Sequence, residues 1–203
     1  METDLSANEL DVIKHRHFLI HKPFGYLSQF VCELKRKKLV GSLFDFPEGT
    51  MAIGRLDEPS EGLLLLTTDG KMSEEVRSRK VEKEYYAQVN GLITNEAIEQ
   101  MQNGVEIGIR DVKYGTLPCR AFRLDPFPVF NARTKKIRGD HHGPTSWVSI
   151  TLTEGKFRQV RKMTAAVGFP TLRLIRVRIG HLLLGDLEAG EVKEVEKFDF
   201  QKD

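Results

Sequence analysis

The sequence has little cysteine and no long apolar run, and both features narrow the class of protein. Only two of the 203 residues are cysteines, Cys32 and Cys119, and their spacing fits no metal motif. The longest apolar run covers residues 63–66, whereas a bilayer span needs roughly 20 residues. The acidic N-terminus, METDLSANELDV, lacks the features of a signal peptide. These absences predict a protein of the reducing cytoplasm, without disulfides or a membrane segment.

Motifs that bind cofactors are also missing. No G-x-x-x-x-G-K-[ST] or G-x-G-x-x-G sequence occurs, so no nucleotide cofactor is expected. His15, His17, His21 and the pair at 141–142 lack the spacing of a zinc site. The sequence therefore predicts neither a metal site nor a bound nucleotide cofactor.

The distribution of charge is more informative than its sum. The net charge is only +2, but lysine and arginine cluster at residues 35–38, 77–83, 133–138 and 158–178, while acidic residues crowd both termini. Local basic stripes of this kind are typical of a surface that meets a polyanion such as nucleic acid. A solvated protein face is the alternative explanation for each run taken alone.

Strand and helix patterns alternate along the chain without a regular rhythm. Strands are expected at residues 17–20, 63–67, 81–90, 105–123, 147–153, 171–180 and 191–195, with a bulge near residue 175. Helices are expected at residues 71–79, 95–103 with Thr94 as the cap, and 157–167. The basic segment 125–144 resembles an inserted loop. This order predicts an α+β fold with a mixed, largely antiparallel sheet.

Asp57 is the first candidate for chemistry. It lies in a turn rich in glycine, proline and serine, directly before the apolar strand at 63–67. A carboxylate that a rigid loop holds at a strand edge is suited to act as a base, a nucleophile or a ligand. An Asx-type turn or a cap is the alternative, and nothing local decides between these interpretations.

A second candidate is the basic segment 154–163. Arg158 lies three residues before Arg161 and four before Lys162, so helical spacing places them on one face. A basic helix start after a glycine turn is suited to bind phosphate; a solvated amphipathic helix is the alternative. The segment 82–86 adds Tyr85, for which packing within a strand is the default interpretation.

Four motifs in order resemble the small-subunit-type branch of the ribosomal RNA pseudouridine synthase family. They are HKPFG at 21–25, GRLDEPSEGLLLLTTDG at 54–70, EKEY at 82–85 and EGKFRQVRKM at 154–163. The stretch 163–176 is most similar to members of the branch that act on the large ribosomal subunit. The sequence departs from the commonest family pattern at Glu58–Pro59 and at residues 77–80.

The resemblance implies a particular architecture. The family fold is an α+β fold whose largely antiparallel sheet forms two halves flanking a catalytic cleft. Residues 1–14 are then an N-terminal tail and residues 15–203 the catalytic domain. Many relatives carry an S4-like RNA-binding domain before the Lys-Pro motif, but only 21 residues precede Lys22 here, so none is expected. A monomer is expected.

The resemblance also implies a reaction. The family isomerises a specific uridine to pseudouridine, here expected in 23S ribosomal RNA or a large-subunit assembly intermediate. Because the product keeps every atom of the substrate, no cofactor and no metal are expected. A non-catalytic RNA-binding ribosome-assembly factor is the main alternative. A hydrolase that uses Asp57 and Glu61 as a carboxylate pair is a second.

By family position, each motif supplies a role. Asp57 is expected to be the essential carboxylate, acting as nucleophile or base on the ribose of a flipped uridine. Arg161 would pair with Asp57 and orient it, and Tyr85 would stack on the target base. Arg55 would fill the vacated stack or bind the adjoining phosphate, and Leu174 would line the uracil pocket. The residues expected to contact the RNA backbone are Lys22, Lys83, Arg158 and Arg176.

Overall fold

A nine-stranded sheet forms the frame of the molecule. The computed structural model describes residues 14–33, 36–78, 81–133, 135–137, 142–198 and 200, so nearly all of the expected tail at 1–14 lies outside the described residues. The strands are β1 (His17–Lys22), β2 (Tyr26–Leu27), β3 (Lys38–Leu39), β4 (Met51–Ile53), β5 (Glu61–Thr67), β6 (Lys83–Asn90), β7 (Glu106–Ile109), β8 (Val112–Gly115), β9 (Arg120–Arg123), β10 (Thr145–Leu152), β11 (Thr171–Ile179), β12 (Leu182–Leu183) and β13 (Val192–Val195). The helices are η1 (Val40–Ser42), α1 (Gly70–Ser78), α2 (Asn95–Asn103) and α3 (Gln159–Ala166).

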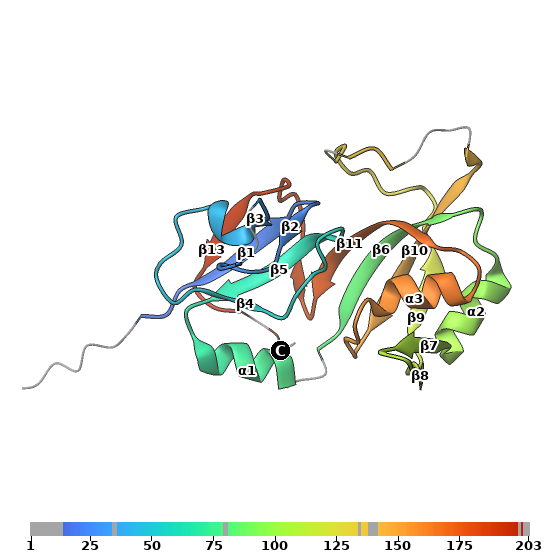
Figure 1. Ribbon diagram of the computed structural model, residues 1–203, viewed down its shortest axis with the longest axis horizontal. Coiled ribbons are helices and arrows are strands. Elements are labelled where there is room, and N and C mark those ends of the chain that lie inside the picture. Colours follow the sequence, from blue (N-terminus) through green and yellow to red (C-terminus); the bar gives the residue numbers. More distant parts are fainter. Residues whose placement is uncertain are drawn as a thin grey trace, which may run out of the picture.

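The sheet consists of two halves that β11 connects. Its order is β13-β1-β5-β11-β6-β10-β9, with β4 added on β5 and β12 on β11. In Figure 1, α1 accompanies the half that contains β1, β4 and β5, whereas α2, α3 and the β7–β8 hairpin accompany β6, β10 and β9. Within the large sheet only the β5–β11 pair is parallel. The predicted fold class, mixed and largely antiparallel, is confirmed.

Three hydrophobic clusters form the core, and one of them joins Leu63 and Leu65 of the first half to Trp147 of β10 in the second. In the first half, every residue of β5 is buried: Leu63 and Leu65 pack in one cluster and Leu64 and Leu66 in another. A strand covered on both faces explains the continuous leucine run, since alternation appears only where one face meets water. In the second half, α2 and α3 pack on β6 and β10, with Met101 and Met163 completely buried.

Most of the expected elements are present, whereas the short strands β2, β3, β4 and β12 were not expected. The Thr94 hydroxyl accepts a hydrogen bond from the amide of Ala97 and caps α2, as predicted. Helix α3 begins only at Gln159, because Arg158 takes a left-handed conformation, with φ 53° and ψ 33°. The bulge expected near residue 175 is confirmed by an irregularity of β11 against β6 at residues 176–178, and a second irregularity lies at residues 171–173. No helix in the described part of the chain is long and apolar enough to span a membrane.

The two halves approach each other most closely at Gly62. Here β5 pairs with β11 through only two residue pairs, Ile175 with Glu61 and Arg176 with Gly62. Gly62 has φ +106°, and a Cβ atom added there would lie 2.3 Å from the backbone oxygen of Arg176. Only glycine satisfies both the backbone conformation and the spacing. The parallel junction therefore fixes the end of the loop that carries Asp57.

Candidate active site

The loop at residues 54–60 holds Asp57 at the start of β5, and several hydrogen bonds fix its path. The Ser28 hydroxyl donates to the Leu56 carbonyl oxygen (2.9 Å) and accepts from the Leu56 amide (3.0 Å). The Ser60 amide donates to the carbonyl oxygen of Asp57 at 3.0 Å. The Asp57 side chain keeps 26% of its surface exposed. A rigid backbone thus presents a partly exposed carboxylate, which is what acid–base or nucleophilic chemistry requires.

The side chain of Lys22 connects this loop to the turn after β1 through hydrogen bonds. Its side chain is completely buried, and Nζ donates to the carbonyl oxygens of Pro23 (3.0 Å), Tyr26 (2.7 Å) and Glu58 (3.4 Å). Burial lowers the pKa of Lys22 to about 7, although the carboxylates of Glu61, Asp57 and Glu58 oppose the shift. The prediction that Lys22 contacts the RNA backbone is wrong for this structure, because a buried amine cannot reach a phosphate. Lys22 instead joins two loops.

Two arginines lie near Asp57, in different roles from those expected. Arg158 is the ion-pair partner that the structure gives to Asp57, with Nη1 3.8 Å from Oδ2. Arg161 does not form the expected direct pair: its Nη2 donates to the Pro59 carbonyl oxygen (2.9 Å) and the Ser60 hydroxyl (3.2 Å). Arg161 therefore fixes the loop, while Arg158 faces the carboxylate.

Burial also affects the charge of Arg161. Desolvation, together with the positive charge of Arg158, lowers the pKa of Arg161 to about 10, and the attraction of Asp57 partly offsets this shift. The side chain is still a cation at neutral pH. Its buried Nε atom makes no hydrogen bond to any residue that the structure describes. Arg161 thus brings a positive charge beneath the Asp57 loop without a direct contact to the carboxylate.

Two adjoining cavities lie in this region, and Asp57 lines the first of them. The first, of about 580 Å³, contains five of the predicted site residues in its lining: Arg55, Asp57, Tyr85, Arg158 and Leu174. The second, of about 530 Å³, shares Arg55 and Tyr85 with the first and adds Lys83 and Arg176. Both volumes fall in the range of small-ligand sites. Seven of the nine predicted residues thus line one continuous region; Lys22 and Arg161 line neither cavity.

Arg176 lines the second cavity but is almost completely buried. Its side chain is 3% exposed, and its Nε donates to the Leu63 carbonyl oxygen at 2.7 Å. The prediction that Arg176 grips the RNA backbone therefore needs correction, since almost none of the guanidinium is accessible. Lys83 is half-buried and donates to the Val81 carbonyl oxygen at 2.9 Å. Burial, and then the charge of Arg176, lowers the pKa of Lys83.

Comparison with known proteins identifies the family of this chain. The model of the RNA pseudouridylate synthase family matches residues 16–166. The chain belongs to this family. Ribosomal large subunit pseudouridine synthase E of Vibrio parahaemolyticus is 38% identical over 191 residues, which cover 92% of this chain and 76% of the relative. The protein of the same name from Xanthomonas axonopodis is 40% identical over 164 residues, covering 80% of this chain and 84% of the relative.

Structural comparison gives the same family. A crystal structure titled as a pseudouridylate synthase superposes with a TM-score of 0.72 and 27% identity, covering 89% of this chain and 70% of the other. The expected similarity to large-subunit synthases is confirmed by the sequence relatives, which are named ribosomal large subunit pseudouridine synthase E. The chain is an RNA pseudouridine synthase, which is an isomerase.

Glu154 is a site residue of the synthase that sequence reasoning missed. Its carboxylate accepts from the Tyr114 hydroxyl (2.6 Å), the Leu117 amide (2.9 Å) and the side-chain amide of Gln159. It thereby links the β7–β8 hairpin to the first turn of α3, directly beside Arg158. Glu154 lines both cavities around Asp57. Its place at the start of the basic motif was the available signal, because Tyr114 and Leu117 lie 40 and 37 residues away in the sequence.

Proposed function

We propose that the synthase converts a specific uridine of 23S ribosomal RNA into pseudouridine, with Asp57 as the carboxylate that acts on the ribose. Residues 15–203 would form the catalytic domain, working as a monomer in the cytoplasm on ribosomal RNA or on an assembling large subunit. The observation that carries the proposal is one cavity that brings together Asp57, Tyr85, Arg158 and Leu174. The names of the similar large-subunit synthases support the choice of RNA.

The surroundings of Asp57 favour a reaction at the sugar. Conversion breaks the N1–C1′ bond and joins C5 to C1′, and the hydrogen at C5 leaves as a proton while N1 gains one. Every atom is conserved, so the site has to supply orientation and charge rather than a reactant. Arg158, 3.8 Å from Asp57, would hold the carboxylate toward the ribose. The hydrogen-bonded loop at 54–60 would keep that direction during turnover.

Recognition of the uridine would require the base to leave its stack. Flipping costs a few kcal/mol, which contacts to the extruded nucleotide must offset. Tyr85, at the junction of the two cavities, offers a ring face for the base, and Leu174 closes the apolar wall. Arg55 is exposed at the beginning of the Asp57 loop and lines both cavities. Its place suits a side chain that fills the vacated stack or binds the neighbouring phosphate.

The direct test is Asp57→Asn, which removes the charge and keeps the shape. With a 23S transcript carrying tritium at C5 of uridine, we expect the variant to release no tritium above background. RNA affinity in a filter-binding assay should stay within about twofold, because one carboxylate makes no phosphate contact. Asp45→Asn, an exposed aspartate outside both cavities, is the matched control and should release tritium like the wild type.

The same assay separates the rival functions. A non-catalytic assembly factor would bind the transcript and release no tritium even as the wild type. A hydrolase would release free uracil, which chromatography of the products would detect. Pseudouridine mapping of 23S RNA from cells that lack the gene would identify the target: loss of one site supports the proposal, and an unchanged map contradicts it.

A further inference from the structure

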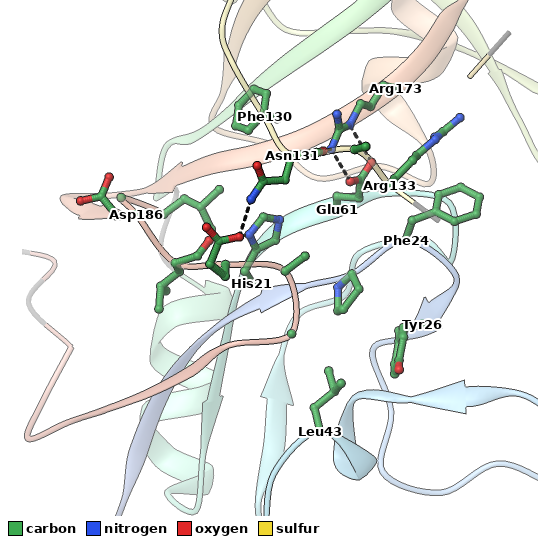
Figure 2. A pocket seen from close by; sticks show the side chains of 18 of the residues that line it. His21, Phe24, Tyr26, Leu43, Glu61, Phe130, Asn131, Arg133, Arg173 and Asp186 are labelled. Atoms are coloured by element: carbon green, nitrogen blue, oxygen red, sulfur yellow. Dashed lines mark hydrogen bonds and ion pairs between the residues drawn. The ribbon is translucent and has the colours of Figure 1, made fainter. Parts of the chain in front are cut away.

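A third cavity, of about 480 Å³, lies outside the region already described (Figure 2). It is bounded by the turn after β1, the segment 129–133 and the loop 184–190, and it shares no lining residue with the two cavities around Asp57. Its volume is in the range of sites for small ligands. The function proposed above gives this cavity no role.

A buried histidine on its wall has one ring nitrogen without a hydrogen-bond partner among the described residues. His21 is only 8% exposed, and its Nδ1 lies 2.7 Å from the Leu187 carbonyl oxygen. A carbonyl oxygen only accepts, so Nδ1 carries the hydrogen and Nε2 of the neutral ring is an acceptor. That Nε2 is buried and has no hydrogen bond to any residue in the described part of the chain. A buried acceptor of this kind is costly unless a ligand donates to it.

Flat, polarisable groups form part of the wall. The guanidinium of Arg133 lies over the ring of Phe24 at 4.5 Å, and that of Arg173 lies over Phe130 at 5.6 Å. In Figure 2 the ring of His21 lies beside the amide of Asn131, which donates to the Glu188 carboxylate at 2.6 Å. Rings and guanidinium planes are the groups on which proteins stack nucleobases.

The charge of the lining argues for a base rather than a free anion. The cations are Lys38, Arg133 and Arg173, and the anions are Glu61, Asp186 and Glu188, so the formal charges cancel. Arg173 is also paired with Glu61 in a buried two-bond contact, at 2.8 and 3.0 Å. An inorganic phosphate would find no excess positive charge, whereas a neutral planar ring with an N–H edge matches both the stacking faces and the acceptor.

The cavity adjoins the machinery around Asp57. Glu61 lines it and comes four residues after Asp57, and the amine of Lys22 joins Tyr26, on its wall, to Glu58 in the Asp57 loop. Arg133 interacts electrostatically with Arg161, which holds the same loop. A further cavity of about 630 Å³ shares Arg133 and Arg173 and is lined by Lys135 and Lys136. This provides a basic path for an RNA backbone.

We propose that the third cavity binds one unpaired nucleotide of the substrate RNA, near the target uridine in sequence. Its base stacks at the Arg133–Phe24 pair and donates an N–H from its Watson–Crick edge to His21 Nε2, and its phosphate follows the basic side chains of the neighbouring cavity. Every nucleobase has an N–H on that edge. The inference rests on the proposed function, because it takes the ligand to be the RNA that Asp57 acts on.

Two variants test this site against a matched control. His21→Asn keeps a donor for the Leu187 carbonyl oxygen and removes the acceptor at the Nε2 position; Phe24→Leu removes the stacking face. Each should raise the KM for a 23S transcript by at least about fivefold, since one stacked base contributes about 1–3 kcal/mol. The control is Phe44→Leu, another partly exposed phenylalanine outside the cavity; its KM and kcat should equal those of the wild type.

Chemical probing identifies the occupant. With the Asp57→Asn protein bound to the transcript, dimethyl sulfate and carbodiimide should reveal one unpaired nucleotide whose Watson–Crick edge is protected. The double variant that carries both Asp57→Asn and His21→Asn should not protect this nucleotide. Equal KM values for all variants, or a footprint that His21→Asn leaves unchanged, would overturn the inference. If His21→Asn does not fold, Phe24→Leu decides both measurements.

The failure of the two proposals can be told apart. If the wild type forms no pseudouridine, the proposed function fails, and filter binding of the same transcript still compares His21→Asn with the wild type. If pseudouridine forms normally while both cavity variants bind RNA like Phe44→Leu, only the nucleotide site fails.

Discussion

Lys22 gives the protein a measurable dependence of stability on pH. The pKa of its amine is about 7 in the folded state, against an ordinary value of 10.5, and burial is the main cause. The unfolded chain therefore binds more protons than the folded chain between these two values. Stability rises with pH across that window: the favourable contribution is complete above about pH 10.5 and is lost as pH falls toward 7.

The magnitude follows from the same two pKa values. For one group that titrates at about 7 when folded and about 10.5 when unfolded, proton linkage adds about 2 kcal/mol to the free energy of unfolding between pH 7 and pH 9. Below pH 7 the amine is protonated in both states, so its contribution becomes flat. Urea unfolding at pH 6, 7, 8 and 9 measures this curve for the wild type.

Lys22→Met isolates the contribution of the single amine. The variant should lose the rise of about 2 kcal/mol between pH 7 and pH 9, whatever its absolute stability, because methionine does not titrate. Lys71→Met, at an exposed position on α1, is the control and should keep the full slope. Equal slopes in the wild type and in Lys22→Met would refute the reasoning that a desolvated amine beneath the Asp57 loop is the cause.

Two further predictions concern the side chains around Asp57. Arg158→Met should lower kcat at least about tenfold and leave the unfolding midpoint nearly unchanged, since it removes the charge that faces the carboxylate. Arg161→Met should instead lower the free energy of unfolding by about 1–3 kcal/mol, because the Pro59 carbonyl oxygen loses its donor. Single-turnover rates and urea curves measured together separate these roles, and an unchanged rate in Arg158→Met would contradict them. Glu154→Gln should raise the protease sensitivity of the β7–β8 hairpin and lower kcat, and identical digestion patterns would count against the link.

Many residues that line the cavity at Asp57 could be named from the sequence, because they lie in motifs shared with the family. The local patterns alone left Asp57 as a possible turn residue and Tyr85 as a packed strand residue, so their proposed roles came from the resemblance. Lys22 illustrates what such patterns leave open. Its Lys-Pro turn has the composition of a surface turn, and the sequence does not reveal that the amine bonds both to its own turn and to the distant Glu58.

The exchange of roles between the two arginines has a backbone cause. Helical spacing places Arg158 and Arg161 on one face only if both belong to the helix. The left-handed conformation of Arg158 puts that residue before the first turn, so its side chain leaves the helix face and meets Asp57. Arg176 was misplaced for a different reason: alternation along β11 does not reveal that the Leu63 carbonyl oxygen of the neighbouring strand β5 holds its guanidinium in the interior.

The junction at Gly62 limits how the halves of the sheet can adapt to a bound RNA. The backbone of Arg176 leaves no space there even for a methyl group, so this end of the cleft is a fixed pivot. Adjustments to different RNA shapes have to come from the outer parts, such as the β7–β8 hairpin that Glu154 ties to α3. Specificity for one uridine would then depend on the periphery, while the reacting carboxylate keeps its place.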